Sequence, residues 1–245
     1  MTIKAIIFDV DGTLADTEDG HRKSFNKAFA ECGLDWNWDI TLYDKLLKVT
    51  GGKERIKHFV QTCSPDFSLP ADYPGDYDGF VKNLHAVKTR YYTQMLSEGH
   101  IPLRPGIKQL MADARSRGIR LAIATTTTPE NVTALLQPAL GADGESWFEV
   151  IGCGDIVPHK KPAPDIYFWV LEKMGLSAAD CIALEDSENG LHSSLAAGIK
   201  TFVTINQYTR NQNFNGAEAV FDDLSDLSNF YRAAGLPFHK QQISA

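Results

Sequence analysis

Cysteine is scarce in this 245-residue sequence, and its spacing excludes the usual zinc-binding and redox motifs. The four cysteines, Cys32, Cys63, Cys153 and Cys181, form no CxxC pair and no zinc-like spacing. We therefore predict that they are reduced thiols in the core of a cytosolic protein.

Positive charge is also in short supply. The sequence has 24 lysines and arginines against 31 aspartates and glutamates, which gives a formal net charge of -7. It contains no long basic run, so its charge argues against a nucleic acid as the main partner. A local basic pocket inside an acidic shell is compatible with this balance.

Long apolar segments are missing as well. No run approaches the roughly 20 apolar residues that cross a bilayer, so we expect no membrane partner. The first apolar strand begins at Ile3, which leaves no room ahead of it for a signal or transit peptide. We expect a cytoplasmic protein.

Short apolar runs alternate with helix-like segments along most of the chain, which is the order of βαβ units. Such units form a parallel sheet that is covered on both faces, so we predict an α/β fold. The predicted strands are Lys4–Asp9, Arg120–Thr125, Phe148–Ile151, Cys181–Leu184, Thr201–Ile205 and a weaker Ala219–Phe221. The predicted helices include Gly106–Gly118, Pro129–Leu140, Pro164–Gly175 and Asn189–Gly198.

The interval from about residue 16 to residue 99 has no convincing strand. Apolar residues recur at helical spacing in two parts of it, around Phe25 and around Leu84, and a segment rich in Pro, Asp and Gly separates them. We predict an all-helical insert, or cap, over residues 16–99. Residues 1–15 and 100–245 would then form the α/β core.

The segment "IIFDVDGT" places two carboxylates, Asp9 and Asp11, directly after the first strand. Buried carboxylates repel each other and lose hydration, so such a pair needs a cation or a reaction nearby. Open parallel sheets bind ligands beyond the carboxyl ends of their strands. The other polar residues expected at those strand ends are Thr125, Lys161, Glu185 and Asp186.

Several carboxylates that converge on one point favour a hard cation, and Mg²⁺ is the usual one beside phosphate. An ionised Asp9 at ~4 Å from a phosphate dianion meets repulsion of roughly 4 kcal/mol per charge pair, which a cation and Lys161 would cancel. Asp9 can then attack as a nucleophile, while Asp11 protonates the leaving alcohol and later activates water. Thr125 and nearby backbone N–H groups would hold the phosphoryl oxygens.

Each motif alone has a simpler structural explanation. DxDGT alone fits a solvated turn, KPAPDIY fits a helix that begins near Pro164, and EDS fits a helix cap on Ser187 or Asp186. Their order at the ends of alternating strands favours one active site.

Taken together, these residues resemble the haloacid dehalogenase superfamily of phosphohydrolases, whose four motifs match Asp9–Thr13, Thr125, Lys161 and Glu185–Asp186. The resemblance covers essentially the whole chain. It implies a Rossmann-like core with a helical cap inserted after the first motif. It also assigns the side chains of Asp9 and Asp186 and the carbonyl of Asp11 to Mg²⁺, with Glu185 supporting them.

Within that superfamily the chain resembles the branch of β-phosphoglucomutase, phosphoglycolate phosphatase and the CbbY phosphatases that accompany red-type Rubisco. The segments "FDVDGTLADTEDGHRKSFNKAFAECGLDW" and "VTGGKERIKHF" look most similar to the CbbY phosphatases. The resemblance implies hydrolysis of xylulose-1,5-bisphosphate, an inhibitor that blocks Rubisco. It implies a functional link to Rubisco in the Calvin cycle, with no stable binding predicted.

A second phosphate on the substrate would need a second cationic site in the cap. The glycines of Thr50-Gly51-Gly52-Lys53 would let backbone N–H groups approach an anion, and Arg55 follows them. For each basic residue, a solvated helix face is the simpler alternative. The predicted substrate-binding residues are Glu18, His21, Thr50, Gly51, Gly52, Lys53, Lys88, Arg90 and Thr126. We expect the cap to open and close about hinges near Asp16–Asp19 and Glu98–Leu103.

Three alternatives stay open from the sequence. A phosphoglycolate phosphatase would use the same core on a smaller substrate, and a sugar phosphomutase would let a second hydroxyl take the place of water. A non-catalytic phosphometabolite sensor or Rubisco partner would keep only the fold, although it would have no use for the intact acidic motifs.

Overall fold

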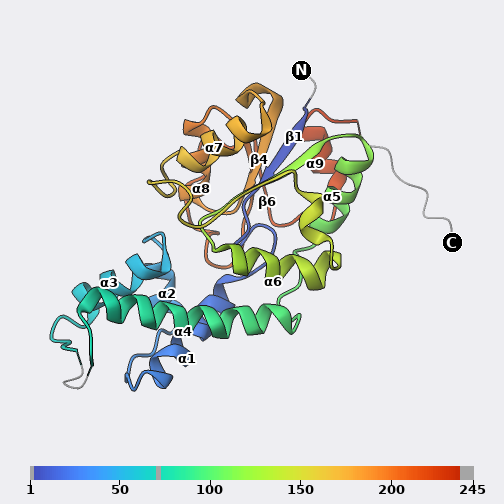
Figure 1. Ribbon diagram of the computed structural model, residues 1–245. Helices are drawn as coiled ribbons and strands as arrows, with labels where there is room; N and C mark the ends of the chain where they lie inside the picture. Colours follow the sequence, from blue (N-terminus) through green and yellow to red (C-terminus); the bar gives the residue numbers. More distant parts are fainter. Residues whose placement is uncertain (1–2, 70–72, 238–245) are drawn as a thin grey trace.

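The computed structural model describes residues 3–69 and 73–237, and its core is a six-stranded parallel sheet (Figure 1). This description leaves out residues 1–2 and 238–245 of the predicted core and residues 70–72 of the predicted insert. The strand order is β3-β2-β1-β4-β5-β6. The strands are β1 (Ala5–Phe8), β2 (Arg120–Ala124), β3 (Val150–Gly152), β4 (Cys181–Glu185), β5 (Lys200–Thr204) and β6 (Ala219–Phe221).

The central strand β1 pairs in parallel with β2 on one side and with β4 on the other. All four of its residues are buried, as expected for a strand that is covered on both faces. Phe8 is level with Ile123 and Leu184, so the three strands end together. This edge receives the predicted motifs, and all six predicted strands are confirmed within one or two residues.

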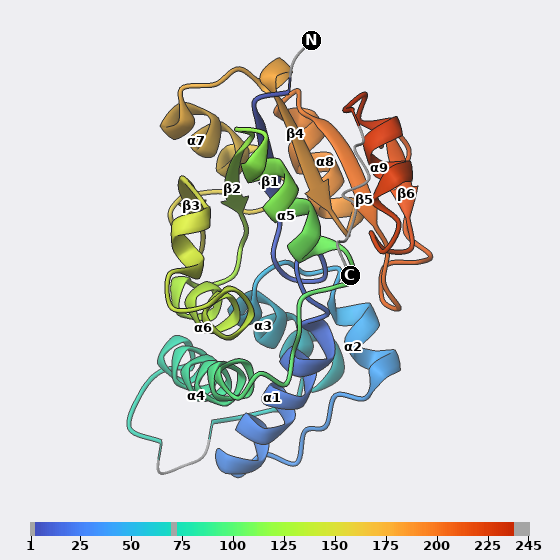
Figure 2. The same ribbon diagram turned by 90° about the vertical axis from the view of Figure 1, so that its right-hand side faces the viewer.

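Helices cover both faces of the sheet (Figure 2). Ile6 and Phe8 of β1 face a core formed with α5, α6 and α9, whereas Ala5 and Ile7 face α7. Helix α8 packs beside α7 over β4 and β5. The helices are α5 (Ile107–Ser116), α6 (Pro129–Leu140), α7 (Asp165–Met174), α8 (Glu188–Ala196) and α9 (Leu227–Ala233), with short 3₁₀ turns at Gly144–Trp147 and Ala178–Asp180.

The insert between β1 and α5 contains four helices and no strand in its described residues, and it lies below the sheet in Figure 1. Its core is aromatic, and Trp38 at its centre contacts Phe25, Phe29 and Phe59 with ring centroids 4.5 to 5.4 Å apart. This apolar core is distinct from the two clusters that flank the sheet, and Tyr208 of the loop after β5 is part of it. Its helices are α1 (Glu18–Glu31), α2 (Ile40–Leu46), α3 (Gly52–Cys63) and α4 (Tyr77–Ser97).

The buried side chain of Arg104 lies where the two segments that connect the sheet to the insert meet. The backbone N–H of Arg104 donates to Leu14 O at 2.8 Å. Its guanidinium donates to the carbonyls of Gly12 at 2.5 Å, Ile205 at 2.6 Å and Asp222 at 2.8 Å. The turn after β1, the segment before α5 and the loops after β5 and β6 therefore meet at one side chain.

The positions of the cysteines differ from the prediction. The four cysteines are free thiols, but only Cys181 is buried and Cys63 is exposed, so the prediction that all four lie in the core is wrong. Cys63 ends α3 on the outer side of the insert, where packing does not require a small apolar residue.

Among the described helices, none is long and apolar enough to cross a membrane.

Candidate active site

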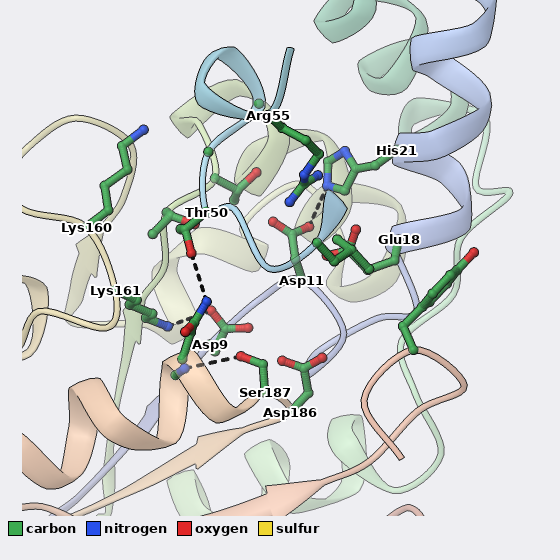
Figure 3. Close-up of a pocket in the computed structure, with 18 of the residues that line it drawn as sticks. Asp9, Asp11, Glu18, His21, Thr50, Arg55, Lys160, Lys161, Asp186 and Ser187 are labelled. Atoms are coloured by element: carbon green, nitrogen blue, oxygen red, sulfur yellow. Dashed lines mark hydrogen bonds and ion pairs between the residues drawn. The ribbon is translucent and has the colours of Figure 1, made fainter. Parts of the chain in front are cut away.

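A cavity of about 1010 Å³ lies between the carboxyl edge of the sheet and the insert (Figure 3). Residues from both parts line it, so the sheet and the insert together form one site. Twelve predicted residues line this cavity, namely Asp9, Asp11, Glu18, His21, Thr50, Gly51, Gly52, Lys53, Lys88, Thr126, Lys161 and Asp186.

Three carboxylates meet at the core side of the cavity. Asp9, Glu185 and Asp186 each offer an oxygen, and these oxygens all lie within 4.8 Å of one another. Lys161 crosses from the loop before α7 and donates to Asp9 Oδ1 at 2.8 Å and to Glu185 Oε1 at 2.6 Å. Tyr167 of α7 also donates to Glu185. The sequence motifs therefore converge as predicted from the strand ends.

Burial and mutual repulsion disfavour the charged forms of Asp9 and Asp186. Burial, and then the Glu185 charge, raises the pKa of Asp9 to about 7, although Lys161 opposes the shift. Burial, Asp9 and Glu185 raise the pKa of Asp186 well above its ordinary value. Burial alone would favour neutral Lys161, but the two carboxylates outweigh it and raise the pKa of its ammonium. The cluster holds more negative charge than one lysine neutralises.

The donor set at this cluster fits a hard divalent cation. Carboxylate oxygens are the ligands that Mg²⁺ prefers, and Asp9, Glu185 and Asp186 supply three such groups at one point. Glu185 Oε2 is buried and has no hydrogen-bond partner among the described residues. Burying a carboxylate oxygen without a partner costs free energy, and a cation bound here would supply that partner.

The Asp11 side chain turns away from this trio toward the insert. It lies 2.9 Å from His21 Nε2, and His21 Nδ1 lies 2.5 Å from Lys88 Nζ. Burial opposes ionisation of Asp11, but His21 outweighs it and lowers the pKa of this carboxyl. Burial lowers the pKa of Lys88 to about 7. The chain of contacts from Lys88 through His21 orients the Asp11 carboxylate.

The threonines after β2 have two roles: one supports the backbone of the turn, and others line the cavity. Thr125 is buried, and its hydroxyl accepts the Thr127 backbone N–H at 3.3 Å. Thr126 and Thr127 line the cavity, whereas Thr125 is not among the residues that line it. The hydroxyl of Thr125 thus fixes the turn that brings Thr126 to the cavity.

The glycine loop of the insert forms the far wall of the cavity. Gly51 has a φ of 97°, which glycine adopts without strain, and α3 begins at the next residue. Thr50 accepts a hydrogen bond from the Asn189 amide of α8 at 3.1 Å. Lys53 pairs with Asp155 of the core at 3.3 Å. The loop therefore makes direct contacts with the core at the cavity mouth.

Arg55 supplies a buried positive charge at the same wall. It is 9% exposed, donates to the Tyr43 hydroxyl at 2.9 Å and lines the cavity. Tyr43 in turn donates to Glu18 at 3.0 Å. Arg55 follows the glycine loop in the sequence, and its i+3 spacing from Gly52 on one helix places the two residues on the same side of that helix.

The structure does not bring every predicted residue to the cavity. Arg90 is 62% exposed in its side chain, pairs with Glu31 on the outer side of the insert and does not line the cavity, so its predicted role in substrate binding needs correction. Unpredicted residues that line it include Lys160, which pairs with Asp155 at 3.1 Å, and Asn189.

The sheet, the inserted helices and the motifs at the strand ends are those of a phosphohydrolase with a cap. Residues 3–198 match the haloacid dehalogenase-like hydrolases, and the chain belongs to this family. The fold and family predicted from the sequence are confirmed.

Within the family, the chain is similar to CbbY proteins. It is 50% identical over 224 residues to the plasmid-encoded protein CbbY of Cupriavidus necator, covering 91% of this chain and 87% of that one. The crystal structure of CbbY from Rhodobacter sphaeroides in complex with phosphate superposes with a TM-score of 0.84 at 44% identity, covering 92% of this chain and 96% of that one.

A second crystal structure of the Rhodobacter sphaeroides CbbY, an aspartate-to-asparagine mutant, contains xylulose-(1,5)bisphosphate. It matches with a TM-score of 0.84 at 43% identity over 92% of this chain and 96% of that one. These similarities and the family match make this chain a phosphatase.

Proposed function

We propose that the protein is a magnesium-dependent sugar-phosphate phosphatase that hydrolyses xylulose-1,5-bisphosphate to xylulose 5-phosphate and phosphate. The observation that carries this proposal is the Asp9 carboxylate, held 2.8 Å from Lys161 within the acidic trio at the cavity floor. A carboxylate so placed has both a neighbouring cation and access to a substrate.

In the first step, a carboxylate oxygen of Asp9 attacks the phosphorus of the substrate, and the bond from phosphorus to the sugar oxygen breaks. Asp11, protonated for this step even though His21 lowers its pKa, gives that proton to the departing sugar oxygen. Lys161 offsets the negative charge that builds up on the phosphoryl oxygens. The Thr126 side of the β2 turn adds polar groups at the same wall of the cavity.

In the second step, water attacks the phosphorus of the aspartyl phosphate on Asp9. Asp11, now ionised, takes a proton from that water as the bond from phosphorus to the Asp9 oxygen breaks, which restores the Asp9 carboxylate and protonated Asp11 and releases inorganic phosphate. The His21 contact keeps the Asp11 carboxylate in place for both transfers.

Asp9, Asp186 and the Asp11 carbonyl would hold Mg²⁺, with Glu185 beside them. The ion supplies Lewis-acid stabilisation of phosphoryl oxygens and lets several anions share one small space. The unpartnered oxygen of Glu185 and the raised pKa of Asp9 support the assignment of a cation here.

The cap, residues 16–99, would select the substrate. The distal phosphate of a bisphosphate would meet the backbone at Gly51 and Gly52 and the positive charges of Lys53 and Arg55. Glu18, His21 and Lys88 line the same cavity, where they would meet the sugar hydroxyls. The relative that was crystallised with xylulose-(1,5)bisphosphate supports a ligand with a phosphate at each end.

Removal of this bisphosphate would serve Rubisco, for which the compound is an inhibitor, within carbon fixation in the cytoplasm. The proposal includes no stable complex with Rubisco, because the activity acts on the inhibitor alone.

A kinetic panel with Mg²⁺ tests the substrate and the reaction together. Xylulose-1,5-bisphosphate, phosphoglycolate and β-glucose 1-phosphate are each incubated with the enzyme, and free phosphate and sugar-phosphate isomers are both measured. We expect the highest kcat/KM and stoichiometric phosphate release with the bisphosphate. If the enzyme prefers phosphoglycolate, the proposed substrate is wrong. Isomer formation without phosphate release would indicate a mutase.

A further inference from the structure

The loop after β5 connects the acidic trio to the aromatic core of the cap. Asn206 donates from its side-chain amide to Asp186 Oδ2 at 2.7 Å. Two residues later, Tyr208 is 7% exposed and belongs to the same buried cluster as Phe25 and Trp38 of the insert. One short loop of the core therefore contacts a proposed metal ligand and the cap.

The Asn206 side chain is fixed in one orientation. Its Oδ1 accepts the backbone N–H of Tyr208 at 2.9 Å, so its NH₂ group is the one that faces Asp186. The backbone N–H of Asn206 donates to the buried Thr209 hydroxyl at 3.0 Å. Held from both sides, the amide in turn fixes the rotation of the Asp186 carboxylate.

Asn206 acts on Asp186 from outside the substrate cavity. It lines a second, smaller cavity of about 330 Å³ together with Gly12, Glu18 and Arg104, and it is not among the residues that line the main one. The space around it is tight: a Cβ at Gly12 would overlap the Asp186 carboxylate and come within 2.8 Å of the Asn206 amide nitrogen. Asn206 is therefore a positioning residue, and it does not touch the substrate.

Tyr208 joins this arrangement to the wall that carries Arg55. Its ring meets that of Tyr43 edge to face, with centroids 6.0 Å apart, and its hydroxyl donates to Asp19 of α1 at 3.4 Å. Tyr43 is the residue whose hydroxyl accepts from Arg55. Figure 2 shows α2, which carries Tyr43, below the end of β5.

We propose that Asn206 positions Asp186 for magnesium and that Tyr208 couples this positioning to the docked cap. The inference rests on the proposed magnesium-dependent activity. Hydrogen-bond partners that orient metal ligands commonly change metal affinity 10- to 100-fold when they are removed. Docking of the cap on Tyr208 would fix the position of the loop after β5. Through Asn206, this loop would then fix the orientation of the metal ligand Asp186.

Isothermal titration of the metal-free protein with Mg²⁺ tests the first half of the proposal. We expect Asn206→Ala to weaken Mg²⁺ binding by about tenfold or more. The matched control is Asn213→Ala, since Asn213 is an exposed asparagine of the same segment whose Oδ1 accepts only a local backbone N–H, that of Asn215. It should bind Mg²⁺ like the wild type.

Phosphate release at saturating Mg²⁺ is measured on the same variants. Asn206→Ala should regain most of its activity there, because its defect is in holding the ion. Thermal unfolding in a chelator shows that each variant is folded, and Asn206→Ser replaces Asn206→Ala if the alanine variant is not. Wild-type Mg²⁺ affinity in the folded variant would overturn the positioning role.

A double-mutant cycle tests the coupling. Tyr208→Leu keeps apolar volume but removes the ring and hydroxyl, and we expect it to weaken Mg²⁺ binding by roughly 2- to 30-fold. The double variant with Asn206→Ala should bind Mg²⁺ no more weakly than Asn206→Ala alone. If Tyr208→Leu binds like the wild type, or if the two effects multiply, the coupling is wrong.

Failure of the proposed function has a different signature. In that case the wild type itself would bind no Mg²⁺ and release phosphate equally well in a chelator. Wild-type Mg²⁺ dependence combined with an unaffected Asn206→Ala variant would overturn only this inference.

Discussion

Replacement of Lys161 by methionine separates the structural and catalytic roles of the buried charge cluster. Its ammonium donates to Asp9 Oδ1 at 2.8 Å, to Glu185 Oε1 at 2.6 Å and to the Ala124 carbonyl at 2.8 Å. The side chain is 6% exposed. Methionine retains the apolar length of the lysine stem, so the substitution removes mainly the charge and its three hydrogen bonds.

The magnitude follows from leaving buried carboxylates without a partner. Removal of one member of a buried ion pair costs about 3–5 kcal/mol of unfolding free energy. We expect that loss for Lys161→Met in a chelator. Mg²⁺ should narrow the difference from the wild type, because the ion binds an acidic cluster more tightly when a neighbouring cation is gone.

Activity should not recover with stability. Lys161 is the proposed partner of the phosphoryl oxygens, and loss of one such preorganised group lowers kcat by roughly 10²–10³-fold. Lys161→Met should therefore be a stabilised but slow enzyme in Mg²⁺. Urea denaturation with and without Mg²⁺, and phosphate release at saturating Mg²⁺, measure the two effects.

The adjacent lysine is the matched control. Lys160 is 22% exposed and pairs with Asp155, which is 68% exposed, at 3.1 Å. Exposed pairs contribute about 1 kcal/mol or less, so Lys160→Met should change the unfolding free energy by no more than that. Equal stability losses for Lys160→Met and Lys161→Met in a chelator would refute the reasoning about buried charge.

Three further predictions address the metal, the cap and the connections between the two parts. Chelation should abolish phosphate release, and Mg²⁺ should restore it; activity in a chelator would remove the metal from the mechanism. Lys53→Ala should raise KM for the bisphosphate more than for a monophosphate, whereas Arg90→Ala, on the outer side of the insert, should leave both values unchanged in steady-state kinetics. Arg104→Ala should lower the free energy of unfolding by about 3 kcal/mol or more in urea titration, because buried carbonyls such as those of Gly12 and Ile205 lose a charged donor; a change below about 1 kcal/mol would contradict that.

The core could be predicted from the sequence because parallel strands are buried on both faces. Ala5–Phe8 and Cys181–Glu185 are continuous apolar runs, and their pairing brings the residues that follow them to one edge. The acidic trio follows from this geometry alone. Ser187 likewise caps α8 by accepting the Gly190 N–H at 3.2 Å, which the local sequence favours.

The cap side could be predicted only in part, because the direction of a helix face depends on docking. Lys88 and Arg90 are two residues apart on α4, about 200° around the helix, so at most one of them can face the cavity. Lys88 is 4% exposed and lines the cavity, whereas Arg90 points outward. The sequence alone does not say which face meets the core.

Asn206 and Tyr208 had no signal in the sequence. They lie in a loop after β5, outside any motif, and their contacts with Asp186 and Tyr43 join segments that are far apart in the chain. Arg104 was missed for the same reason, since its acceptors are backbone carbonyls, which every residue possesses.

The central claim is that Asp9 carries the phosphoryl group during turnover. Rapid quenching of the wild type with radiolabelled substrate, followed by peptide mapping, tests it most directly, with Asp9→Asn measured alongside. We expect label on the peptide that contains Asp9, its release by hydroxylamine, and neither label nor turnover in a folded Asp9→Asn variant. Label on another peptide, or undiminished turnover by Asp9→Asn, would contradict it.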